Sequence, residues 1–229
     1  TKIKKENKQN EFNFLLRKNL HHFIENLKIF LSKKLNIFSF SLVMFLIFIA
    51  IFSPILSPHQ FDQVNPSNAL APPSLEHFMG TDTTGRDIFS RVLHGTTTSL
   101  SLALTTIIFG LVTGVSLGAI SGYFVGIVDE IIMRIVDVFM SIPGVILALA
   151  MLAILGPDPI YLVLALSIRR IIQFARVTRG IVLSIKELDY ISACHAIGMG
   201  HVRIIFIHVL PNCIGPIIVL STVLIGNVI

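Results

Sequence analysis

Residues 189–211 read DYISACHAIGMGHVRIIFIHVLP, and this stretch decides how the chain is organised. It lies between two long apolar runs, so it is expected to form a compact loop at a membrane face. The small residues Ser192, Ala193 and Ala196 predict a short helix, and Gly198 predicts its end. A surface of small side chains lets another protein approach closely, which is typical of a docking element. The alternative is an ordinary loop whose helix ends at a glycine.

The composition excludes an ordinary soluble domain, which needs a charged surface. Of the 229 residues, 53% are hydrophobic and only 14% are charged, and the mean hydropathy is +0.81. About 20 apolar residues suffice to cross a bilayer as a helix. Five runs of about this length cover residues 37–56, 100–123, 135–155, 160–179 and 213–229. We therefore predict an all-α polytopic membrane protein, whose first run is a retained anchor and not a signal peptide.

The distribution of basic residues predicts the orientation in the membrane. Residues 1–34 contain nine Lys or Arg and three acidic residues, whereas residues 57–97 contain two Arg and four acidic residues. Because basic segments stay on the cytosolic side, the N-terminus and residues 180–211 are expected inside, and residues 57–97 outside. The net charge of +5 is therefore a signal of topology, and no nucleic-acid partner is predicted.

These observations divide the chain into four segments. They are a basic cytosolic segment (1–34) with an amphipathic helix at 12–30, a first transmembrane helix (35–56), an external loop (57–97) and a membrane core (98–229) that contains the loop 180–211.

The external loop contains a second informative stretch, HFMGTDTTGRDIFSRVLHG, at residues 77–95. Thr81 or Asp82 is expected to cap a short amphipathic helix there. Two acid–base pairs with the spacing and order of helix ion pairs would lie along it: Asp82–Arg86 and Asp87–Arg91.

Both stretches resemble the membrane subunits of ABC importers. Residues 189–211 are similar to the EAA motif (E-A-A, three residues, Gly, nine residues, Ile, one residue, Leu-Pro), with Ser192 in place of Glu and His208 in place of Ile. The resemblance assigns ATPase coupling to Asp189, Tyr190, Ser192, Ala193, Cys194, Gly198, Leu210 and Pro211. Residues 77–95 resemble the H-x-x-G-T-D-x-x-G-R-D-x-x-S-R-x-x-x-G block of peptide- and nickel-importer permeases. The matching residues are His77, Gly80, Thr81, Asp82, Gly85, Arg86, Asp87, Ser90, Arg91 and Gly95.

The resemblance extends over about residues 37–229 and implies a type I importer transmembrane domain of the dipeptide, oligopeptide and nickel group. Such domains have six spans, so the chain, with five, is expected to be incomplete at its C-terminus. The implied partners in the bacterial inner membrane are a second homologous permease, two ABC ATPase subunits and an external solute-binding protein. The loop 189–199 would move with the ATPase and switch the cavity between inward-facing and outward-facing. ATP and Mg would be used by the ATPase subunits, with no cofactor on this chain.

The predicted second and third spans contain residues that affect helix packing. Glycines 110, 114, 118 and 122 recur at four-residue spacing, which favours close helix–helix contact. Pro143 is expected to kink the third span. Arg134 is expected to pair with Glu130 or Asp137 near the cytosolic interface.

Arg169 and Arg170 lie about ten residues into the fourth span, where each would cost about 2.5–3.5 kcal/mol against lipid. They are therefore expected to face a wet cavity or a partner helix. One hypothesis is that at least one lines the translocation path and favours anionic or carboxylate-bearing substrates. The other is that one pairs with an acid on a sixth span or on the partner subunit.

No catalytic, cofactor or metal site is predicted. The chain has no P-loop, H-E-x-x-H or G-x-S-x-G motif, and Cys194 and Cys213 have no nearby Cys/His cluster and are not expected to form a disulfide. A membrane-embedded enzyme therefore lacks support. A stand-alone secondary transporter or channel remains the alternative, favoured by the arginine pair. The substrate stays open among dipeptides, longer peptides, nickel and other chelates.

Overall fold

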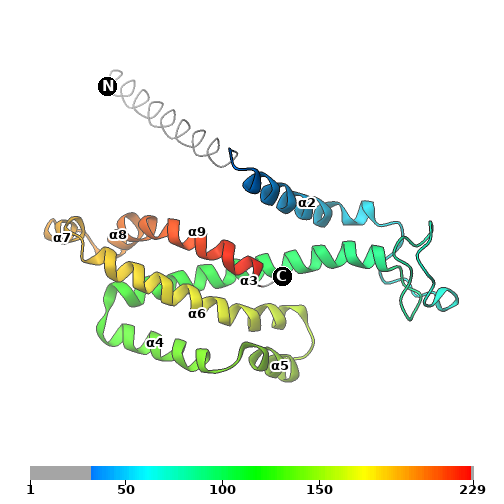
Figure 1. The fold of residues 1–229 in the computed structure, drawn as a ribbon. Coiled ribbons are helices and arrows are strands. Elements are labelled where there is room, and N and C mark those ends of the chain that lie inside the picture. The colour runs from blue at the N-terminus through cyan, green and yellow to red at the C-terminus, as the bar shows by residue number, and fades with distance from the viewer. Residues whose placement is uncertain (1–31, 228–229) are drawn as a thin grey trace, which may run out of the picture. The chain divides into compact units, whose positions relative to one another are not determined.

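The computed structural model describes residues 32–227, which are largely helical (Figure 1). The elements are α2 (Lys34–Leu56), η1 (Pro66–Asn68), α3 (Ile88–Phe124), α4 (Gly126–Ser141), α5 (Gly144–Leu155), α6 (Pro159–Lys186), α7 (Asp189–Ala196), α8 (His201–Ile204), the π-helical turn η2 (Ile205–Val209) and α9 (Leu210–Gly226). Within residues 32–227 the only extended pairing is an isolated antiparallel bridge between Thr81 and Asp87. The predicted all-α class is confirmed, and the amphipathic helix expected at 12–30 lies outside the described residues. The chain divides after Thr97 into two compact units.

The first unit contains α2, the loop that follows it and the first turns of α3. α2 is 23 residues long and exposes most of its large apolar side chains, as a helix surrounded by lipid does. The hydroxyls of Ser53 on α2 and Thr97 on α3 lie 2.8 Å apart and join the two helices. The loop is held together by backbone hydrogen bonds, including those from Leu70 N–H to the Asp82 carbonyl (3.0 Å) and from Thr81 N–H to Ala71 (3.1 Å).

The start of α3 differs from the expectation. The helix begins at Ile88, not near Thr81 or Asp82, and continues without a break for 37 residues to Phe124. Its N-terminus is capped by Asp87, whose Oδ2 accepts the Ser90 N–H at 2.7 Å. Asp82 therefore lies in a turn before the helix, and the predicted short helix is the first part of a long one.

The second unit is built around α6, which contacts α4, α5, α7 and α9. Figure 1 shows α9 and α4 running beside α6. Fully buried apolar side chains from α6, α7 and the α8–η2 segment form its core. They include Phe174, Ile191, Ile204 and Val209.

The glycine stripe of α3 lies directly against α6. A Cβ atom added at Gly114 would lie 2.6 Å from the Ile171 carbonyl oxygen, and one at Gly118 would lie 2.4 Å from that of Ala175. Distances this short leave no room for a side chain. The stripe therefore brings the two helix backbones together, as the four-residue spacing predicts.

Replacing Gly118 with alanine is expected to destabilise the chain by about 1–3 kcal/mol, because the added methyl group overpacks the contact with α6. Gly180→Ala is the matched control, since Gly180 also lies in a helix but has open space around its Cα. It should leave stability unchanged or raise it by about 0.5–1 kcal/mol. Thermal unfolding of the purified variants in detergent measures both. Equal midpoints for the two variants would contradict the close contact.

The third predicted span is broken into two helices at Pro143, where the sequence predicted a kink. α4 and α5 meet at an angle of 89° on either side of Ile142 and Pro143. Ile142 is extended, with ψ of 125°, because a residue that precedes proline is disfavoured in the helical region. Proline also fixes its own φ and lacks an N–H, so it starts α5 in place of continuing α4.

Three helical segments are long and apolar enough to cross a membrane: α2, α3 and the run His201–Gly226. The bent pair α4–α5 adds a fourth if it counts as one span. Helix α6, expected to be the fourth span at residues 160–179, does not meet this criterion and carries four arginines. By length and composition, residues 32–227 thus provide three or four of the five predicted spans.

Candidate functional site

The loop that follows α6 contains a short helix with a complete C-terminal cap. Helix α7 begins at Asp189, whose carboxylate in the first turn suits the helix dipole. Gly198 has a φ of +77°, and its N–H donates to the His195 carbonyl at 2.9 Å. The Met199 N–H donates to the Cys194 carbonyl at 3.0 Å. These two bonds form a Schellman motif, which confirms the predicted helix end.

Helix α7 has one anchored face and one exposed face of small residues. Ile191 and Cys194 are buried in the core of the second unit. Ser192, Ala193 and Ala196 are exposed, as the docking prediction requires. Cys194 was assigned to the same role by resemblance, but its side chain points into the core and is not on the exposed face.

The chain after α7 is tied back to it. Asn212 on α9 donates to the Tyr190 hydroxyl at 3.3 Å and to the His208 carbonyl at 2.6 Å. Leu210 and Pro211 begin α9 directly after the π-helical turn.

A polar group that the sequence did not single out connects α7 to the end of α3. The hydroxyl of Tyr123 lies 2.9 Å from His201 Nδ1 and 3.3 Å from His195 Nε2. Lys186, at the end of α6, donates to the Tyr123 carbonyl at 2.7 Å. The three partners lie 63 to 78 positions after Tyr123 in the sequence, so no local pattern could have predicted these contacts.

An ion pair joins three helices of the second unit near the same end. Arg179 on α6 donates twice to Asp129 on α4, with Nε–Oδ1 at 2.6 Å and Nη2–Oδ2 at 2.5 Å. The hydroxyl of Ser121 on α3 also donates to Oδ1 of Asp129. Of the two predicted partners of Arg134, Glu130 pairs with it at 3.7 Å. The other, Asp137, pairs with Arg176 instead.

The two mid-helix arginines occupy different surroundings. Arg169 is exposed and lines two cavities, of about 330 and 460 Å³, between α4–α5 and α6. Arg170 is buried and donates to the Gln173 side chain at 2.8 Å and to the Asn227 carbonyl at 3.3 Å. Its Nε has no partner in the part of the chain that the structure describes. Within residues 32–227 no acidic side chain forms an ion pair with either arginine.

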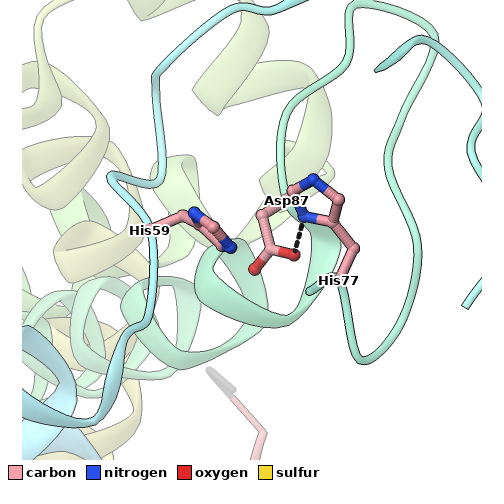
Figure 2. Close-up of side chains that lie close together, drawn as sticks. All are labelled: His59, His77 and Asp87. Carbon is pink, nitrogen blue, oxygen red and sulfur yellow. Dashed lines mark hydrogen bonds and ion pairs between the residues drawn. The ribbon is translucent and has the colours of Figure 1, made fainter. Parts of the chain in front are cut away.

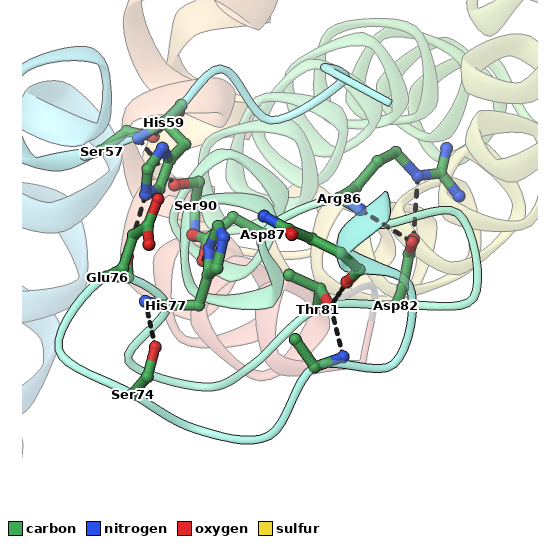
Figure 3. Close-up of polar contacts among 12 residues, drawn as sticks. Ser57, His59, Ser74, Glu76, His77, Thr81, Asp82, Arg86, Asp87 and Ser90 are labelled. Atoms are coloured by element: carbon green, nitrogen blue, oxygen red, sulfur yellow. Dashed lines mark hydrogen bonds and ion pairs between the residues drawn. The ribbon is translucent and has the colours of Figure 1, made fainter. Parts of the chain in front are cut away.

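In the first unit, Asp82 is the centre of a polar turn (Figure 3). Its carboxylate accepts the Thr84 hydroxyl at 2.7 Å, the Arg86 backbone N–H at 3.0 Å and Arg86 Nε at 2.8 Å. Arg91 also donates to it, so Arg91 pairs with Asp82 and not with Asp87 as predicted. The hydrogen bond from Thr84 is the main reason that the pKa of Asp82 lies well below its usual range; burial opposes this and Arg86 adds to it.

Two glycines of the same block occupy positions that no other residue fits. Gly85 has a φ of +75°, and a Cβ there would lie 1.7 Å from the Asn65 carbonyl oxygen. Gly80 has a φ of +73°, and its Cβ would lie 2.5 Å from the Ala71 carbonyl oxygen. The block therefore specifies a tightly folded loop. Gly80 and Gly85 are needed there for their positive φ angles and close backbone contacts.

Asp87 is buried between a helix N-terminus and a histidine. Its Oδ1 lies 3.0 Å from His77 Nδ1, and its Oδ2 accepts the Ser90 N–H at 2.7 Å. Burial alone would raise the pKa of Asp87, but the hydrogen bonds from Ser90 and His77 more than offset it, so the pKa is lowered. His59, which sequence analysis did not single out, packs its ring 4.7 Å from that of His77.

Acidification is therefore expected to loosen the loop between α2 and α3. A carboxyl group whose pKa is lower in the folded chain contributes stability above its unfolded value of about 3.9 and loses it as the pH falls through the folded value. For Asp82 and Asp87, protection of residues 57–90 from hydrogen exchange should hold from pH 7 to about pH 5 and fall below about pH 4. Asp82→Asn should weaken that pH dependence. A pH-independent protection would contradict the assigned contacts.

These features define a class of protein: an all-α polytopic membrane protein with a short, anchored helix of small residues in the loop before the apolar helix α9. Comparison with known families identifies it further. The chain belongs to the family of binding-protein-dependent transport system inner membrane components, which matches residues 114–229. Residues 24–73 match the N-terminal transmembrane domain of oligopeptide transport permease C. The resemblance inferred from the two motifs is thereby confirmed.

Individual relatives are peptide transport permeases. The chain is 40% identical over 198 residues to a dipeptide transport system permease protein of Alkalihalophilus pseudofirmus, covering 86% of this chain and 65% of the relative. It is 33% identical over 193 residues to the oligopeptide transport system permease protein of Bacillus subtilis (84% and 63%). It is 37% identical over 190 residues to a glutathione transport system permease protein of Pectobacterium atrosepticum (80% and 62%). The chain thus spans just under two thirds of the length of these relatives.

Proposed function

We propose that this chain is a permease subunit of an ATP-driven importer for peptides or related small solutes. The family and the permease relatives support the class of transporter. The subunit would form half of the translocation path and carry out no bond chemistry. Its partners would be a second homologous permease, two ABC ATPase subunits that use ATP and Mg, and an external solute-binding protein. The basic N-terminus would face the cytosol of a bacterial cell.

The exposed face of α7 is the observation that carries this proposal. Ser192 and Ala193 offer a surface on which an ATPase can sit closely, while Ile191 fixes the helix in the core. A displacement of α7 would therefore be passed on to α6, α9 and, through Tyr123, to α3. This coupling gives ATP binding by the partner a mechanical path to the membrane helices.

Site-directed cross-linking tests the contact. The native cysteines, Cys194 and Cys213, are free and buried and would be replaced by alanine. Ser192→Cys in this background is expected to cross-link to the ATPase subunit in assembled transporters. Thr83→Cys, exposed in the external loop, is the control and should not. Cross-linking of neither variant, in a transporter that still imports, would contradict the docking role of α7.

We further propose that Arg169 lines the translocation path and that Arg170 has a structural role. Arg169 faces two cavities, and its guanidinium would attract a peptide carboxylate. Arg170 is instead held by Gln173 and by the backbone of Asn227. A partner subunit that supplies an acid to Arg169 is the competing account.

Arg169→Gln is expected to reduce uptake of peptides with a free carboxylate by about tenfold, because a hydrogen bond to a charged group contributes about 1.5–3 kcal/mol. Uptake of the same peptides with an amidated C-terminus should change little. Arg134→Gln, which alters an exposed arginine, is the control. Equal losses for free and amidated peptides would assign Arg169 to assembly or folding instead.

The rival function is a secondary transporter that works alone, for which the arginine pair is the one favourable observation. Such a protein needs ionisable groups that relay a coupling ion at mid-depth. The exposed, capped α7 has no use in that mechanism.

A further inference from the structure

Three side chains in the external loop meet in an arrangement suited to a metal ion (Figure 2). His59, His77 and Asp87 each offer one ligand atom, and these atoms all lie within 4.8 Å of one another. They come from three segments: the stretch after α2, the middle of the loop and the residue that caps α3. The sequence predicted no metal site, because the first and last ligands lie 28 positions apart and no local motif joins them.

Two of the three ligands, His59 and Asp87, are also held by residues outside the cluster. His59 Nε2 lies 2.9 Å from the Glu76 carbonyl oxygen, and the His59 backbone N–H donates to Ser90 Oγ at 3.3 Å. Asp87 is 3% exposed and is fixed by the Ser90 N–H at 2.7 Å. Figure 3 shows these contacts around the cluster. Supporting hydrogen bonds of this kind orient ligands before an ion arrives.

The space beside the three side chains favours a cation. They line a cavity of about 170 Å³ with polar and acidic neighbours, and its lining contains no lysine or arginine. The remaining lining residues are Gln60, Gln63, Asn65, Asn68, Glu76 and Gly85. Among the residues that the structure describes, no arginine or lysine pairs with the carboxylate of Asp87, in contrast to Asp82 in the same loop. The ionised Asp87 would therefore gain a cationic partner from a bound metal.

We propose that His59, His77 and Asp87 bind one divalent transition-metal ion of the Zn²⁺ type. Two imidazole nitrogens and one carboxylate oxygen are the ligands that Zn²⁺ accepts, whereas Ca²⁺ and Mg²⁺ prefer oxygen alone. A water molecule completes a tetrahedral set. The ion links the segment after α2 and the middle of the loop to the first turn of α3. Its binding stabilises the folded loop, by a free energy that grows with the ratio of the free ion concentration to the Kd. This role does not depend on the transported substrate.

The test is zinc binding by the purified full-length chain in its assembled transporter. The complex is stripped with a chelator, equilibrated with ZnCl₂ against a competing chromophoric chelator, and analysed for zinc per complex. One tightly bound zinc per copy of this chain is expected. His59→Gln, which removes a half-buried ligand, should lower the affinity by at least the 10–100-fold that loss of a supporting contact produces. Asp87→Asn should do the same.

His94→Gln is the matched control, because His94 lies in the same unit and packs on Phe61 but is not one of the three residues whose ligand atoms meet. It should retain the wild-type affinity. Absence of zinc from the wild type overturns the proposal, as does zinc binding that is equal in the wild type and His59→Gln. Equal loss in His59→Gln and His94→Gln also overturns it, since the zinc would then be adventitious. None of these results bears on whether the transporter imports peptides, so the two proposals fail independently.

Discussion

Replacing Ala193 with arginine is expected to abolish ATP-driven uptake while leaving the chain folded and in the membrane. Ala193 is exposed on α7, so a long side chain meets no residue of its own unit. If this face docks as proposed, however, the arginine side chain would hold the ATPase away by several ångströms. Removing a close contact at the centre of an interface costs about 2 kcal/mol or more, and bulk at that point adds to the cost. Uptake should fall by at least 30-fold.

The matched variant is Ala193→Ser, which is similar in size and should transport normally. Expression, membrane insertion and thermal unfolding of both variants should match the wild type, because Ile191 and Cys194 on the anchored face are unchanged. Near-normal uptake by Ala193→Arg would show that this face of α7 does not dock.

The second large effect is expected at the ion pair between Arg179 and Asp129. Arg179→Gln removes two hydrogen bonds to a carboxylate whose side chain is only 12% exposed, and it leaves Asp129 with the Ser121 hydroxyl alone. Because the Arg179 side chain is 34% exposed, solvent screens part of the loss, and we expect a cost of about 2–3 kcal/mol. The yield of folded protein in detergent should fall accordingly.

A double-mutant cycle separates the pair from other effects. Asp129→Asn should be about as destabilising as Arg179→Gln, and the two together should cost much less than their sum. Additive costs would mean that the helices α4 and α6 are held together by apolar packing and that the ion pair contributes little.

Much of the second unit could be predicted from local sequence. The end of α7 depends on a single glycine with positive φ, and the close packing of α3 depends on glycines four residues apart. Both signals are local, and the structure confirms both. The exposed small residues of α7 could be predicted from the same stretch. The inward position of Cys194 could not, because it depends on packing against the core of the second unit.

The first unit was harder to predict because its loop is shaped by distant contacts. Asp82 and Asp87 have the spacing of helix ion pairs, yet Asp82 pairs with Arg86 in a turn and Asp87 caps α3 beside His77. The predicted pair Asp82–Arg86 is confirmed, whereas the predicted pair Asp87–Arg91 and the helix at Asp82 are wrong, because tight turns at Gly80 and Gly85 replace the helix. The Tyr123 group and the place of His59 had no sequence signal, because their partners lie far away along the chain.

The bend between α4 and α5 shows how a local signal can be underestimated. Proline predicts a kink within a span, but it occurs here with an extended residue before it, and together they turn the chain by 89°. The resulting cavity beside α6 contains Arg169. A mid-helix arginine and a broken neighbouring helix are therefore parts of one feature.

Transport by the purified, reconstituted complex tests the central claim most directly. Proteoliposomes that contain this chain, the proposed second permease and the proposed ATPase subunits would be supplied with a binding protein and peptide outside. We predict that uptake requires ATP and Mg on the inner side and stops when the ATPase is omitted. Uptake that continues without ATPase or ATP, driven by an ion gradient, would contradict the account and establish a secondary transporter.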